Sequence, residues 1–243
     1  MRKLTLPTDP RIWFKLWVVS LLLNSIPGVL FAQAQTEVTS ILAGIINATT
    51  PLMTLLVMLF IFRDEKVSLH QIVGLIIGAL GIATVFGIWN GVGNNPLWAI
   101  LMLLSAVLCY GISYPYSKRY VIPLQLPAEV LAATQLIMGT VTLLPFYLID
   151  GIAEDQYRVI PLLSMLALGI FGSGFAYIWN FHVIKGAGSA IASTVTYITP
   201  LVAVAMGLFF LDEPLTWNEP VGGLIVLLGA AISQNRLVLF RRA

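Results

Sequence analysis

Long apolar runs alternate with short charged segments along this chain of 243 residues. The uncharged runs cover residues 16–36, 38–62, 67–117, 130–149, 159–184, 186–211 and 220–235. The run 67–117 is too long for one membrane span, and the sequence NGVGNNP at 90–96 in its middle is typical of a turn. We therefore predict eight helices, over about 12–33, 40–62, 70–89, 97–117, 128–149, 159–181, 189–211 and 220–239.

Each predicted helix is close to the ~20 residues that cross about 30 Å of hydrocarbon at about 1.5 Å per residue. Lone strands would leave backbone groups unpaired in lipid, and the alternating pattern of a membrane barrel is absent from the sequence. Hydrophobic residues make up 58% of the chain and charged residues 10%, which is too little charge to cover a water-facing surface. The sequence thus predicts an all-α integral membrane protein that has the lipid bilayer as its partner.

Basic residues fall almost entirely on one side of the predicted topology. If the N-terminus lies in the cytoplasm, Arg158 is the only one of the 13 Lys and Arg residues on the outer side. The cytoplasmic ones are Arg2, Lys3, Arg11, Lys15, Arg63, Lys66, Lys118, Arg119, Lys185, Arg236, Arg241 and Arg242. The positive-inside rule therefore predicts a multi-pass protein of the cytoplasmic (plasma) membrane with both termini in the cytoplasm.

The first predicted helix has an alternative interpretation. The segment Phe31–Ala34 follows a basic start and resembles the cleavage site of a signal peptide. We favour a retained span, because the internal repeat requires residues 16–36 as a helix.

The sequence contains two similar halves. Ser40, Ala43, Thr50, Pro51 and Leu52 recur 149 residues later as Ser189, Ala192, Thr199, Pro200 and Leu201. Asp64, Glu65, Gly74 and Gly81 recur 148 residues later as Asp212, Glu213, Gly222 and Gly229. The predicted topology places the first Asp-Glu pair in the cytoplasm and the second outside, so the two copies cross the membrane in opposite directions. Inverted repeats of this kind are the architecture of many secondary transporters.

These residues resemble a known family. The segments Asn24–Ala32, Ala43–Leu52, Arg63–Lys66 and Gly74–Gly81 are similar to the first EamA-type repeat of the drug/metabolite transporter superfamily. The segments Gly172–Asn180, Ala192–Pro200, Leu211–Glu213 and Gly222–Gly229 are similar to the second repeat. The resemblance implies an export function for small metabolites or amino-acid-like solutes.

Family members have ten helices in two inverted repeats of five, so the resemblance implies an incomplete inverted-repeat bundle here. We expect residues 1–90 to form a partial first repeat of three helices, and residues 91–243 a second repeat of five. The two helices that precede them in the family are expected to be missing. An inactive or regulatory truncated membrane protein that packs with other helices is therefore an alternative, and a homodimer is possible.

Enzyme chemistry is not indicated by the sequence. His70 and His182 lack metal-ligand spacing, and the phosphate-binding loop of an ATP-driven pump is absent. The single cysteine, Cys109, excludes an internal disulfide and a cysteine-rich metal site. We expect no catalytic residues, no metal, no cofactor and no nucleic-acid partner. A buried carboxylate for proton coupling is also absent from the spans, so coupling could use His182 or the missing helices, or be absent.

Polar residues inside the spans are the candidates for a solute pathway, because hydrocarbon penalises polar groups without partners. They are Asn24, Asn47, Thr50, Tyr110, Tyr114, Gln135, Tyr177, Asn180, Thr196 and Tyr197. Hydrogen bonding between helices is the alternative role, and for a single Thr it is the better one. Pro51 and Pro200 occupy equivalent positions and are expected to bend their helices beside the pathway.

Overall fold

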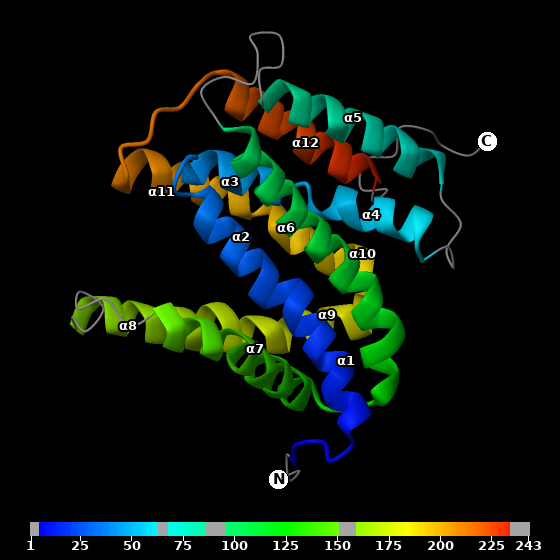
Figure 1. The fold of residues 1–243 in the computed structure, drawn as a ribbon. Coiled ribbons are helices and arrows are strands. Elements are labelled where there is room, and N and C mark those ends of the chain that lie inside the picture. Colours follow the sequence, from blue (N-terminus) through cyan, green and yellow to red (C-terminus); the bar gives the residue numbers. More distant parts are fainter. Residues whose placement is uncertain (1–4, 63–67, 86–95, 151–158, 234–243) are drawn as a thin grey trace. The chain divides into compact units, whose positions relative to one another are not determined.

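The computed structural model describes residues 5–62, 68–85, 96–150 and 159–233 (Figure 1). Within these ranges, all regular secondary structure is helical. The chain divides into two compact units, residues 1–25 with 116–188 and residues 26–115 with 189–243. Each unit combines segments from both predicted repeats. The Asp64-Glu65 pair and the predicted turn at 90–95 lie outside the described residues.

The first unit is built mainly from two pairs of packed helices, α1 with α7 and α7 with α9. Asp9 caps α1 by accepting a hydrogen bond from the backbone N–H of Arg11 at 2.8 Å. The described elements of the first unit are α1 (Pro10–Ser20), η1 (Leu21–Ser25), η2 (Ser117–Val121), η3 (Ile122–Leu124), α7 (Ala128–Asp150), α8 (Val159–Ala167), η5 (Leu168–Phe175) and α9 (Ala176–Ala187). Both η1 and η5 are π-helical, and they occupy equivalent places in the two predicted repeats.

The second unit contains the halves of two broken helices and a tightly packed helix pair. Its elements are α2 (Ile26–Ala34), α3 (Ser40–Asn47), α4 (Thr50–Phe60), α5 (Leu69–Val85), α6 (Leu97–Tyr116), α10 (Ser189–Ala192), η6 (Ser193–Tyr197), α11 (Thr199–Phe210) and α12 (Asn218–Ser233). Helix α3 packs against α11, and α5 packs against α12.

Each of the eight predicted spans contains a described helix, and the ends of two of them, 86–89 and 234–239, lie outside the described residues. Five continuous helical segments are long and apolar enough to cross a membrane, and α5, α11 and α12 are shorter apolar helices. Large apolar side chains such as Ile149 and Phe209 are about four-fifths exposed, at 81% and 79%. Such surfaces suit a lipid environment, and the prediction of an all-α membrane protein is confirmed.

Helices α5 and α12 run antiparallel and touch along a stripe of glycines (Figure 1). The backbone of Gly74 meets that of Gly229, and the backbone of Gly81 meets that of Gly222. These four glycines are the ones that recur between the two halves. Gly74 thus meets the counterpart of Gly81, and Gly81 meets the counterpart of Gly74. Packing of this register is what a two-fold relation between inverted copies produces.

The same two helices begin with equivalent caps. Before α5, the Gln71 side chain accepts a hydrogen bond from the backbone N–H of Ser68 at 2.7 Å. Before α12, the Glu219 carboxylate accepts one from the backbone N–H of Thr216 at 3.0 Å. Both are capping boxes, in which the side chain three residues on closes the first turn. Their spacing of 148 residues extends the repeat beyond the motifs that the sequence analysis used.

Candidate functional site

The helix that contains Pro51 is broken between α3 and α4. Proline has no N–H to donate to the carbonyl four residues earlier, which belongs to Asn47. The hydroxyl of Thr50 donates to this carbonyl at 2.7 Å, and the hydroxyl of Thr49 donates to that of Ile46 at 2.7 Å. The expected bend at Pro51 is thus present as a break, whose backbone acceptors are satisfied by threonines.

The equivalent break in the second half lies between η6 and α11, next to Pro200. Here Asn47 donates from its side-chain amide to the hydroxyl of Thr199 at 3.3 Å. Close packing at Gly44, where an added Cβ would meet Ala203, holds α3 and α11 together around this bond. The structure therefore brings Asn47 and Thr50 together with the residue that corresponds to Thr50 in the other half.

The remaining candidates of the second unit lie on η6 and α6. Thr196 is buried and donates to the carbonyl of Ser193 at 2.9 Å. The side chain of Tyr197 lies outside what the structure describes. Tyr114 is buried, and the ring of Tyr110 stacks on Phe31 with centroids 6.1 Å apart.

A second polar cluster surrounds the π-helical segment η1 in the first unit. Gln135 on α7 donates from its side-chain amide to the Oδ1 atom of Asn24 at 2.6 Å. The hydroxyl of Tyr177 donates to the carbonyl of Leu23 at 3.4 Å. Three residues that are far apart in the sequence, Asn24, Gln135 and Tyr177, are thus brought to one segment. Asn180, half-buried on α9, has no hydrogen-bond partner within the described part of the chain.

Glu213 is a structural residue that the site prediction missed. Its carboxylate accepts hydrogen bonds from the backbone N–H groups of Ser40 at 2.8 Å and Ile41 at 3.1 Å. Thr39 satisfies the next N–H, that of Leu42, at 3.1 Å. The loop after α11 therefore caps the start of α3. The recurrence of Asp-Glu in both halves was the available sequence clue. The sequence did not show that Glu213 would cap the start of α3.

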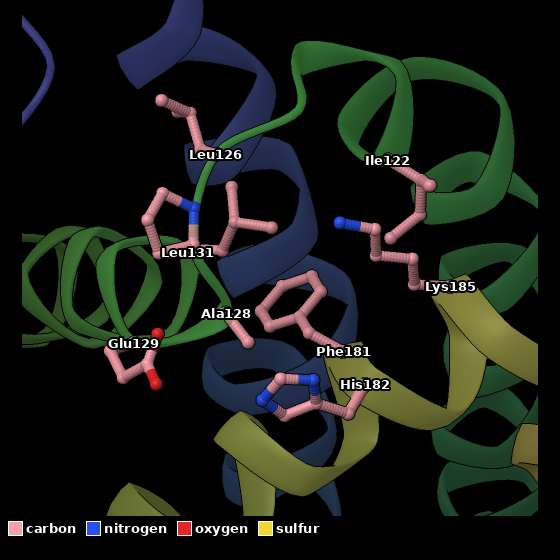
Figure 2. A pocket seen from close by; sticks show the side chains of 9 residues that line it. Ile122, Leu126, Ala128, Glu129, Leu131, Phe181, His182 and Lys185 are labelled. Atoms are coloured by element: carbon pink, nitrogen blue, oxygen red, sulfur yellow. The ribbon is translucent and has the colours of Figure 1, made fainter. Parts of the chain in front are cut away.

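A cavity in the first unit lies between the start of α7 and the end of α9 (Figure 2). Its volume is about 410 Å³, within the range of small-molecule sites. Figure 2 shows Lys185 extending into it, with His182 and Glu129 at its edge and Phe181 at its centre. Its lining residues are Ile122, Leu126, Pro127, Ala128, Glu129, Leu131, Phe181, His182 and Lys185. None of the predicted pathway residues is among these.

A smaller cavity of about 20 Å³ lies beside the break at Pro51. It is lined by Pro51, Thr54, Leu55, Met58, Gln71, Ala190 and Ser233. This volume is sufficient for a single water molecule, because one needs roughly 10–15 Å³ of such space.

Comparison with known proteins identifies the family. Residues 1–87 and 97–234 match the EamA-like transporter family. The chain belongs to the EamA-like transporter family. This membership confirms the resemblance drawn from the sequence motifs, and with the apolar helices it makes the chain a multi-pass membrane protein.

Relatives of the family support the same conclusion. The chain is 26% identical over 181 residues to YoaV of Bacillus subtilis, described as an uncharacterized transporter, covering 74% of this chain and 61% of the relative. It is 30% identical over 191 residues to YedA of Escherichia coli K12, described as an uncharacterized inner membrane transporter, covering 74% of this chain and 57% of the relative. These matches thus span less than two thirds of either relative.

A solved crystal structure of a protein with 18% identity superposes with a TM-score of 0.68. The superposition covers 97% of this chain and 81% of the other. At this identity the likeness shows a shared fold.

Proposed function

We propose that this EamA-like protein is a secondary transporter that exports small metabolites or amino-acid-like solutes by alternating access. The observation that carries the proposal is the bond between Asn47 and Thr199. It joins two helices, each broken beside a proline, that occupy equivalent positions in the two repeats. Broken helices in such pairs form the substrate sites of many transporters, because their free backbone groups can face a polar solute.

The antiparallel contact of α5 with α12 supports the alternating-access step. Two similar bundles of opposite orientation can exchange conformations, so that one pathway opens first to one side and then to the other. The repeats would be residues 1–90 and 91–243, with both termini in the cytoplasm.

The charged cavity between α7 and α9 supports an amino-acid-like solute. Lys185 can pair with an anionic group, and Glu129 can pair with an ammonium group. Leu131 and Phe181 provide apolar contact for a side chain. Lys185 and Glu129 line the same cavity, so both can contact one solute.

The proposal is tested by transport in proteoliposomes loaded with a mixture of radiolabelled amino acids. Replacing Asn47 or Asn180 by Ala is expected to lower the flux severalfold without lowering the yield of folded protein. Thr140→Ala is the control, because Thr140 is exposed and donates only to a carbonyl of its own helix, that of Leu136 at 3.0 Å. Flux that is unchanged in both asparagine variants would remove them from the pathway.

A second candidate is an inactive or regulatory membrane protein that packs with other helices. The chain spans 61% of the length of YoaV, so this relative contains residues that the match does not cover. Fusing two upstream helices from such a relative distinguishes the candidates. Transport that appears only in the fusion would favour the second candidate, and transport by the chain alone would exclude it.

A further inference from the structure

Among the described residues of the first unit, three buried side-chain oxygens have no hydrogen-bond partner. They are the hydroxyls of Ser20 and Ser25 and the Oε1 atom of Gln135. Their side chains are almost fully buried, with exposed fractions of 0%, 3% and 0%. An unpaired polar group is costly away from water, and most buried ones are satisfied. Three such oxygens on the packed elements α1, η1 and α7 therefore indicate a ligand that satisfies them.

The two serine hydroxyls lie close to Gly139. A Cβ atom added to Gly139 would lie 2.8 Å from the Ser20 hydroxyl and 3.7 Å from the Ser25 hydroxyl. Gln135 is one helical turn before Gly139 on α7, so it belongs to the same face. The absence of a side chain at Gly139 lets the Ser20 hydroxyl approach α7 closely, on the face that carries Gln135.

The orientation of the Gln135 amide is set by its neighbour. Its Nε2 atom donates to Asn24 at 2.6 Å, which leaves Oε1 as an acceptor. The serines flank η1, a π-helical segment, and such segments in helices occur frequently at functional sites. The site thus offers an amide carbonyl and two hydroxyl oxygens.

We propose that this Ser20–Ser25–Gln135 cluster binds a sodium ion. Hard cations prefer oxygen ligands, and the cluster has only neutral oxygens. Because it contains no carboxylate, it suits a single positive charge better than a divalent one. The site does not include the Asn47–Thr199 pair. Of its residues, the sequence singled out Gln135 as a pathway candidate, without an ion site. Its use as a coupling site rests on the proposed transport function, whereas ion binding does not.

Binding is tested on the full chain, purified in detergent, by thermal unfolding and calorimetric titration. Sodium chloride is compared with potassium chloride and N-methylglucamine chloride at equal ionic strength. We expect a saturable increase of the melting temperature in sodium that exceeds the increase in the other two salts. Equal melting temperatures in all three salts, with no heat of sodium binding, would overturn the proposal and leave a buried water as the occupant.

Variants locate the ion. Ser20→Ala and Gly139→Ala are expected to abolish the sodium-dependent shift, the first by removing a ligand and the second by displacing the Ser20 hydroxyl. Ser113→Ala is the matched control, because Ser113 is an equally buried hydroxyl without a partner, in the other unit. A sodium shift that persists in both test variants would place the ion elsewhere and contradict the assignment. Because no transport is measured, failure of the proposed function would leave this result unaffected.

Discussion

At the scale of single residues, the breaks in the helices are explained by prolines together with hydroxyls. Pro51 and the threonines before it are visible in the sequence, and the structure confirms that the helix departs from regularity there. Glu213 and the buried serines could not be assigned from the sequence. A carboxylate in a loop and a serine in an apolar run acquire their roles only from the residues that the fold places opposite them.

The cap formed by Glu213 leads to a prediction about stability. Glu213→Ala removes both acceptors from the first N–H groups of α3 and the favourable charge at its N-terminus. We expect the free energy of unfolding to fall by about 1 kcal/mol, as for loss of a typical N-cap. The measurement is chemical unfolding in detergent, with Glu37→Ala as the control because Glu37 is exposed. Equal effects of the two variants would show that the cap contributes nothing specific.

At the scale of helices, the sequence predicted the number and positions of the apolar segments well. Length and apolar content decide whether a helix can span lipid, and both are properties of a local segment. The breaks within 40–62 and 189–211 were harder to predict from the sequence, because a proline removes one hydrogen bond without determining whether the helix bends or stops. The glycines that recur between the halves lie where the backbones of α5 and α12 approach most closely, so these sequence positions mark a helix contact.

This contact predicts a strong effect of bulk at Gly74. In Gly74→Leu the added side chain would meet the backbone of Gly229 and Ser233, which cannot move away without separating α5 from α12. We expect a loss of about 1–3 kcal/mol or more, the usual range for overpacking. Thermal unfolding in detergent measures it. Gly186→Leu is the control, because a Cβ there would meet nothing within 4 Å. Similar unfolding temperatures for both variants would contradict the packing of this helix pair.

At the scale of the whole molecule, the sequence predicted two related halves but not the division into compact units. Each unit combines helices from both halves, such as α1 with α7 and α3 with α11. These pairings depend on packing between residues more than 100 positions apart, as in the bond between Trp17 and Thr142 at 2.9 Å. A repeat in the sequence shows which segments are similar, whereas side-chain packing decides which segments meet.

The central claim is that the two halves cross the membrane in opposite directions. Ser68 and Thr216 test it directly, because they occupy equivalent positions at the capping boxes of α5 and α12. In a Cys109→Ser background, each is replaced by Cys and exposed to a membrane-impermeant maleimide in intact cells and in inside-out vesicles. We predict that Thr216→Cys is labelled in intact cells and Ser68→Cys only in inverted vesicles. Labelling of both from the same side would contradict the inverted architecture and the transport mechanism proposed from it.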